Sequence, residues 1–177
     1  MRSLSRLFGV GACALTLLFF AGCGHDKNLS PTSDLIYDGP YPATQDIDVN
    51  PPFTHLEYFL FHIVLSDPNL SIIPADAWVI DSATGTFATV DPNHHLLAPL
   101  PDVNIASPTV ISSRTNSQYA ITLMTQDWLT TNAPATPPWG TDVVNVTLTM
   151  TVRAHRNRDG VQKTFPITWS FTLRDIP

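Results

Sequence analysis

Two runs near the end of the chain alternate between apolar and polar residues, with Lys163 the exception on the inward side near the turn, and they constrain the fold more than any other feature. They cover 144–155 and 161–174, and the turn sequence Asn157-Arg158-Asp159-Gly160 separates them. Alternation of this kind buries one side of a strand and leaves the other in water. It predicts a long β-hairpin whose apolar face packs against a second sheet. The predicted inward residues are Val144, Val146, Leu148, Met150, Val152, Ala154, Val161, Phe165, Ile167, Trp169, Phe171 and Leu173.

Composition favours the same fold class. The chain is rich in Thr, Val, Ile, Pro and Asn, and Glu57 is its only glutamate, so residues that favour helices on a protein surface are scarce. A length of 177 residues suits one domain with a core of ordinary size. We expect an all-β, antiparallel sandwich.

The remaining strands are predicted from shorter patterns. Residues 53–65 are apolar on both parities, which is typical of a strand covered on both faces, although a buried helix fits the same pattern. Further strands are expected at 77–80, 86–90, 103–113 and 118–125. The sequence 81–85 is expected to turn the chain, and Pro108 makes 103–113 an edge strand.

The N-terminus has the features of an export signal. Arg2 and Arg6 precede an apolar run at 7–20, which is too short to span a bilayer comfortably. Ala21-Gly22-Cys23 then resembles the lipobox of bacterial lipoproteins, with Phe20 where that family usually has an aliphatic residue. The resemblance implies cleavage before Cys23 and acylation of Cys23, including a palmitate-type chain, as the anchor in the membrane. Gly24 in place of an aspartate implies sorting to the outer membrane.

The predicted organisation has three parts. Residues 1–22 are the signal peptide, 23–45 are the lipidated N-terminus and a flexible tether, and 46–177 are the folded domain. The tether is predicted from polar residues and from prolines without any period. The expected location is the bacterial cell envelope, with the lipid on Cys23 in the outer membrane.

Cysteine usage and charge exclude several classes of site. The cysteines are Cys13 and Cys23, so a mature domain lipidated at Cys23 has no thiol for a disulfide, a zinc site or an iron–sulfur cluster. A net charge of −6 argues against nucleic acid as a partner. We expect no cofactor.

Several short pieces resemble the bacterial Ig-like domains of surface proteins. They lie at 46–54, 66–68, 81–86, 118–123 and 168–172. The resemblance implies an Ig-like antiparallel β-sandwich over 46–177. Members of that family are mostly spacers, stalk units and adhesion modules, so it implies architecture rather than chemistry.

Candidate metal ligands are few and poorly arranged. Asp46, Asp48, Asn50 and Glu57 occupy places 1, 3, 5 and 12 of an EF-hand-like loop, but Pro51 stands where a sharp turn needs glycine. A weak calcium site near Asp46 and Asp48 stays open. His94-His95 and the pair His55 and His62 lack convergent partners in the sequence. We predict no metal site.

No catalytic motif is present, since the sequence has no Gly-x-Ser-x-Gly, no His-Glu-x-x-His and no glycine-rich phosphate loop. A loop predicted at 126–141 carries Trp128 and Trp139, which are candidates for a contact site. The leading hypothesis is a non-catalytic structural or protein-interaction module. The alternatives are a carbohydrate-binding surface module that uses Trp128 and Trp139, and an envelope hydrolase.

Overall fold

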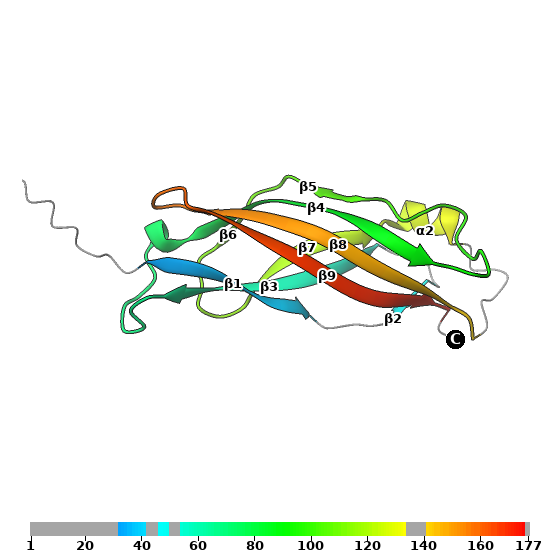
Figure 1. Ribbon diagram of the computed structural model, residues 1–177, viewed down its shortest axis with the longest axis horizontal. Coiled ribbons are helices and arrows are strands. Elements are labelled where there is room, and N and C mark those ends of the chain that lie inside the picture. Colours follow the sequence, from blue (N-terminus) through cyan, green and yellow to red (C-terminus); the bar gives the residue numbers. More distant parts are fainter. Residues whose placement is uncertain (1–31, 42–45, 50–53, 134–140, 176–177) are drawn as a thin grey trace, which may run out of the picture. The chain divides into compact units, whose positions relative to one another are not determined.

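The computed structural model describes residues 32–41, 46–49, 54–133 and 141–175. This part of the chain is mainly β and forms two sheets, as the composition predicts (Figure 1). The described helical elements are one turn of 3₁₀ helix, η1 (Pro74–Asp76), and one short helix, α2 (Gln126–Asn132).

The smaller sheet has three antiparallel strands, in the order β1-β3-β7. These are β1 (Ser33–Tyr41), β3 (His55–Leu65) and β7 (Ser117–Met124). The central strand is β3, which corresponds to the apolar run predicted at 53–65. Its neighbours come from the start and the middle of the chain.

The larger sheet has six strands and contains the predicted hairpin, β8 and β9. Its strands are β2 (Asp46–Asp48), β4 (Trp78–Val90), β5 (Val103–Ile105), β6 (Thr109–Ile111), β8 (Val143–Arg156) and β9 (Gln162–Arg174). The order is β2-β9-β8-β4-β5, and β6 also pairs with β4. The short strand β2 pairs with the end of β9 in parallel, while the other pairs are antiparallel.

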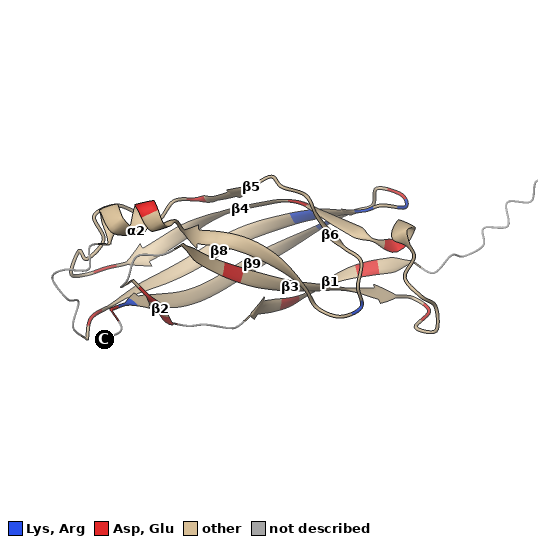
Figure 2. Ribbon diagram, turned by 180° about the vertical axis from the view of Figure 1, so that it is seen from behind, with Lys and Arg blue, Asp and Glu red and all other residues tan. Residues whose placement is uncertain are grey.

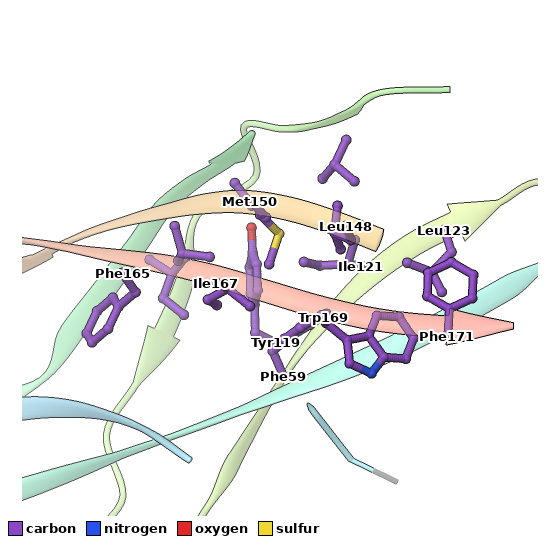
Figure 3. Close-up of a cluster of buried hydrophobic side chains, with 14 of the residues drawn as sticks. Phe59, Tyr119, Ile121, Leu123, Leu148, Met150, Phe165, Ile167, Trp169 and Phe171 are labelled. Atoms are coloured by element: carbon purple, nitrogen blue, oxygen red, sulfur yellow. The ribbon is translucent and has the colours of Figure 1, made fainter. Parts of the chain in front are cut away.

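The core lies between the two sheets and is rich in aromatic rings (Figure 3). Phe61 of β3 meets Phe165 of β9 edge to face, with ring centroids 5.3 Å apart. Trp169 stacks on Phe171 at 4.5 Å along the inner face of β9. Such pairs add to the free energy gained from burying their area.

The hairpin prediction is confirmed almost residue by residue. All six predicted inward residues of β8 are buried, as are Phe165, Ile167, Trp169, Phe171 and Leu173 of β9. Val161 precedes β9 and is exposed, because it lies in the turn. Gly160 has φ +69°, a left-handed conformation that suits glycine at a tight turn.

The turn expected at 81–85 is wrong, because β4 runs through it as one strand. The pairing of β4 with β8 shifts between Ile80 and Ser82, so Asp81 is the extra residue of a β-bulge. Gly85 lies inside the strand, where a Cβ atom would come 2.8 Å from the carbonyl oxygen of Thr149. The glycine therefore permits close approach of β8 rather than a change of direction.

Three further predictions are corrected. The tether predicted for 23–45 is wrong for Ser33–Tyr41, since these residues form β1 and pair with β3. The predicted loop 126–141 begins with α2, whose N-cap Thr125 accepts a hydrogen bond from the Trp128 amide at 3.2 Å. The single edge strand predicted at 103–113 is two short strands, β5 and β6, which both pair with β4.

Candidate functional site

The outer face of the three-stranded sheet carries exposed apolar side chains. Side chains of β3 alternate, so that Phe59, Phe61 and Ile63 enter the core while their neighbours point away from it. We call the outward set the outer apolar face. It consists of Ile36 and Tyr41 from β1, Leu56, Tyr58, Leu60 and Val64 from β3, and Ala120 from β7.

The strand register brings part of this set together around Tyr58. Tyr58 lies opposite Tyr41 on one side and Ala120 on the other, and Leu60 lies opposite Gly39. Tyr41, Leu56 and Val64 remain 55%, 47% and 45% exposed. Polar side chains share this face, because Leu56 lies opposite Thr122, Leu60 opposite Gln118 and Val64 opposite Asp34, so the apolar side chains are interspersed with polar ones.

Charges at this face are acidic. The strands β1, β3 and β7 contain no lysine or arginine (Figure 2). Asp34 and Asp38 border the face on β1, and the Asp38 carboxylate lies 2.5 Å from Nδ1 of His62. The outer apolar face is therefore bordered by two carboxylates, of which Asp34 pairs with Lys163 of β9 at 2.7 Å.

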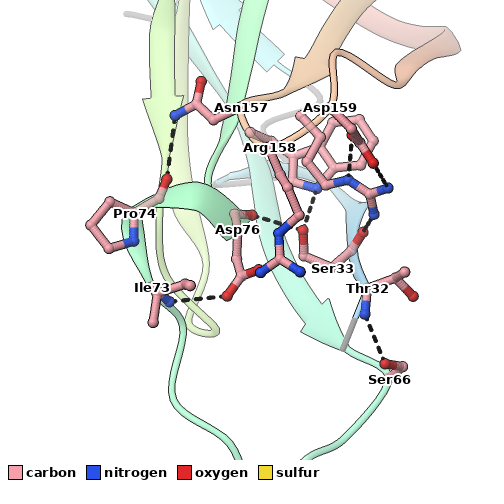
Figure 4. A network of polar contacts seen from close by, with 11 residues as sticks. Thr32, Ser33, Ser66, Ile73, Pro74, Asp76, Asn157, Arg158 and Asp159 are labelled. Carbon is pink, nitrogen blue, oxygen red and sulfur yellow. Dashed lines mark hydrogen bonds and ion pairs between the residues drawn. The ribbon is translucent and has the colours of Figure 1, made fainter. Parts of the chain in front are cut away.

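A polar network fixes the first residue of β1 to the rest of the domain (Figure 4). The Ser33 hydroxyl donates to the carbonyl oxygen of Asp76 at 2.8 Å and accepts from Trp78 Nε1 at 3.2 Å. The Arg156 guanidinium donates to the Ser33 carbonyl oxygen at 2.6 Å. Ser33 is 3% exposed, so each of these partners replaces water.

Two ion pairs complete the network. Arg156 donates from Nε and Nη2 to the two carboxylate oxygens of Asp159, at 2.9 and 2.7 Å. This hydrogen bonding raises the pKa of Arg156 and lowers that of Asp159. Arg158 donates to the buried carboxylate of Asp76 at 2.5 Å. The network thus joins the start of β1 to η1 and to the β8–β9 turn.

The residues predicted from the sequence as site residues do not gather in one place. Cys23, the predicted lipidation site, and Trp139 lie outside the described residues. Trp128 lies on α2, half-buried, and packs against the core. Packing of this kind uses part of the indole surface that a ligand would otherwise contact.

Asp46 and Asp48 lie on β2 and take part in local contacts. The Asp46 carboxylate accepts a hydrogen bond from the Thr172 hydroxyl and lies 3.5 Å from Arg174. Ring nitrogen Nε2 of His55 lies 2.8 Å from the carbonyl oxygen of Asp48, and burial lowers the pKa of this histidine. Within the described ranges, no three His, Cys, Asp or Glu side chains are grouped so that they could hold a metal ion.

His95 has a contact that sequence spacing did not reveal. Its Nδ1 lies 3.1 Å from Asp91, and its Nε2 lies 3.5 Å from Asp142, which directly precedes β8. Asn93 also donates to Asp142, at 2.8 Å. His94 has φ +55° at the turn that follows β4. These contacts join the loop after β4 to the start of β8.

No helix within the described ranges is both long and apolar enough to span a membrane. No protein-family model matches the sequence, and no curated protein matches it. The crystal structure of a protein from Archaeoglobus fulgidus aligns with 82% of this chain and 98% of its own, at 11% identity and a TM-score of 0.36. A similarity this distant carries no argument about function.

Proposed function

We propose that this chain is a lipid-tethered, non-catalytic protein of the bacterial envelope that contacts a protein partner through its outer apolar face. The observation that carries the proposal is the exposure of Leu56, Val64 and Tyr41 on one face of the three-stranded sheet. Soluble domains seldom expose large apolar patches, and those that do commonly use them for interaction. Tyrosine is also enriched at the energetic centres of protein interfaces.

The partner is a protein whose apolar contact surface is bordered by Lys or Arg. Asp34 and Asp38 flank the face, Asp34 being paired with Lys163 of β9 and Asp38 with His62, and its three strands contain no lysine or arginine. Opposite charges around an apolar centre increase the association rate and the specificity of an interface. The net charge of −6 acts in the same direction.

The anchor belongs to the proposal as well. The acyl chains on Cys23 hold the protein at the membrane because they are buried in the bilayer. Ser33 lies ten positions after Cys23, which limits the distance to the start of β1 to about 35 Å. The network around Ser33 then passes any tension on the anchor into η1 and the hairpin turn.

The finer fold assignment is that the two sheets form a divergent Ig-like sandwich. It is supported by the packing of both inner faces into one core, as in two-sheet domains of that kind. An experimental structure that resolves 42–53 and 134–140 tests it through the complete strand order. A continuous barrel through those residues would contradict it.

The test of anchoring uses Cys23→Ser in the native host. The unaltered protein should incorporate a clickable fatty acid and sediment with membranes, while the variant should lose the label. Undiminished labelling of the variant would exclude Cys23 as the acylation site.

The test of the contact face uses a photo-crosslinking residue at Tyr58, and the same residue at Thr149 as the control. Thr149 is exposed on β8, outside the outer apolar face. The Tyr58 probe should capture one envelope protein, and sequencing of the crosslinked peptide should place it at an apolar site beside Lys or Arg. Leu56→Lys should abolish capture, whereas Leu56→Met should preserve it. A crosslink to a second copy of this chain, or equal capture from Thr149, would overturn the proposal.

A further inference from the structure

A hollow on the outer face of the six-stranded sheet has the features of a second, separate binding site. It has a volume of about 450 Å³ and lies beside the bulge of β4, against β8 and the first residues of β9. The side chains that matter are Ser82, Thr151, Arg153, Gln162 and Thr164. Pockets for small ligands start at roughly 300 Å³, so the hollow can hold one sugar ring.

The bulge shapes one side of this hollow. Because Asp81 is the extra residue of β4, Ser82 pairs with Arg153 of β8, and Arg153 in turn pairs with Thr164 of β9. Asp81 accepts a hydrogen bond from His155 Nδ1 at 2.8 Å, which fixes its carboxylate at the rim. Bulges re-aim side chains in this way beside binding sites.

Arg153 differs from every other basic residue in the described structure. Each of the others contacts an oxygen: Arg114 contacts main-chain carbonyls, and Arg156, Arg158, Lys163 and Arg174 contact carboxylates. No hydrogen bond or ion pair engages the Arg153 guanidinium within the described residues. In a chain with net charge −6, Arg153 is therefore the exception among the described basic residues, since it has neither a carboxylate nor a carbonyl partner.

The neutral side chains around Arg153 are also unengaged. The hydroxyls of Ser82, Thr151 and Thr164 and the amide of Gln162 make no side-chain hydrogen bond to another described residue. Hydroxyl and amide groups donate and accept, as the hydroxyls of a sugar do. The five polar side chains come from three neighbouring strands, so the scaffold that holds them is rigid.

Charge limits what the hollow can accept. Arg153 and Lys163 are positive, but Asp81 is a carboxylate in the same lining, and the Lys163 ammonium already lies 2.7 Å from Asp34. The remaining charge suits one carboxylate, which Arg can bind through two parallel hydrogen bonds. Asp81 repels a phosphate dianion about twice as strongly as it repels a carboxylate monoanion.

We propose that this hollow binds a carboxylated sugar, with the carboxylate on Arg153 and the ring hydroxyls on Ser82, Thr151, Gln162 and Thr164. The site lies on a different sheet from the outer apolar face and uses no residue of it. The proposal therefore does not rest on the proposed protein contact. Loss of either one leaves the other intact.

The experiment titrates the full-length protein in detergent micelles with sodium glucuronate, using calorimetry and ligand-observed NMR. Glucose, acetate and inorganic phosphate are the comparison ligands. We expect saturable binding of glucuronate, and binding at least about tenfold weaker for each comparison ligand. Binding of acetate would show that the hollow accepts any carboxylate. Binding of phosphate would show that it accepts anions in general.

Arg153→Gln should weaken glucuronate binding by at least about tenfold, a difference near 1.4 kcal/mol. Arg174→Gln, which removes the same charge at the far end of β9, should leave binding unchanged. Circular dichroism of both variants checks their folding. The proposal is overturned by equal binding of acetate or phosphate, by no binding of glucuronate, or by equal effects of the two arginine variants.

Discussion

Trp169 of β9 meets Phe59 of β3 edge to face across the interior, with ring centroids 6.1 Å apart and ring planes at 90°. The two residues belong to different sheets, so this contact is one of those that hold the sheets together. Trp169 is 8% exposed, as its place in the alternating pattern predicts.

Replacing Trp169 by alanine should therefore cost about 3–5 kcal/mol in the free energy of unfolding. The matched control is Ser170→Ala on the opposite side of β9. It should cost under about 1 kcal/mol, since it removes only an exposed hydrogen bond to Thr147. Urea unfolding followed by fluorescence and circular dichroism measures both. Similar costs would mean that the register of β9 is shifted by one residue.

The sequence was most informative where one physical requirement acted alone. The hairpin β8–β9 has one dry and one wet face, and the resulting alternation predicted its inward residues correctly. β1 was missed because Gly39 and Pro40 resemble a linker, while pairing with β3 is a long-range effect. Thr125 was the available signal for α2, since threonine is a favourable N-cap.

The outer apolar face was only partly predictable. The run 53–65 is apolar on both parities, a pattern that predicts coverage on both faces. The described structure covers one face, and Leu56 and Val64 of the other are exposed. Periodicity reports how apolar each face is, but it does not report whether the covering element belongs to the same chain.

Gly85 offers a test of the corrected strand β4. An alanine Cβ would lie 2.8 Å from the Thr149 carbonyl oxygen and 2.9 Å from the Met150 Cβ, so β4 and β8 would have to separate. Gly85→Ala should lose about 1–3 kcal/mol through overpacking, although alanine suits a strand better than glycine does. Thr86→Ala, on the exposed side, should stay within about 1 kcal/mol. If 81–85 were a turn, Gly85→Ala would be no worse than this control.

The buried side chain of Tyr119 offers a substitution that should not lower the free energy of unfolding. Its hydroxyl is buried and has no hydrogen-bond partner among the described residues, and burial raises its pKa. Tyr119→Phe removes an unpaired polar atom but keeps the ring contact with Phe61 at 6.4 Å. Stability should stay equal or rise by about 1 kcal/mol. A loss above that size in thermal unfolding would reveal a partner for the hydroxyl.

Ser33 tests the attachment of β1. Ser33→Ala leaves Trp78 Nε1 and the Asp76 carbonyl without their partner, at about 1–3 kcal/mol for each buried group left unpaired. Limited proteolysis should then cut the chain near β1 sooner. Ser66→Ala is the control, since its hydroxyl accepts an exposed hydrogen bond from Thr32 at the same corner. Equal protease resistance of the two variants would argue that β1 is held by other contacts.

Asp91 predicts a dependence of stability on pH. Burial raises the pKa of this carboxyl, but hydrogen bonds from the amides of Leu96 and His95, together with the His95 ring, outweigh burial and leave the pKa below its ordinary 3.8. Folding therefore favours the carboxylate. The resulting stabilisation is complete above the unfolded pKa and is lost as the pH falls through the lower folded value.

Asp91→Asn should accordingly destabilise the protein at pH 7, and its deficit relative to the unaltered protein should shrink as the pH falls below 3.8. Urea unfolding at pH 7 and pH 3 measures the two differences. Asp102→Asn, at an exposed position in the same connection between β4 and β5, controls for the loss of one charge. If the stability deficit of Asp91→Asn instead grew as the pH fell, the folded state would bind the Asp91 proton more tightly than the unfolded state does. That result would contradict the lowered pKa.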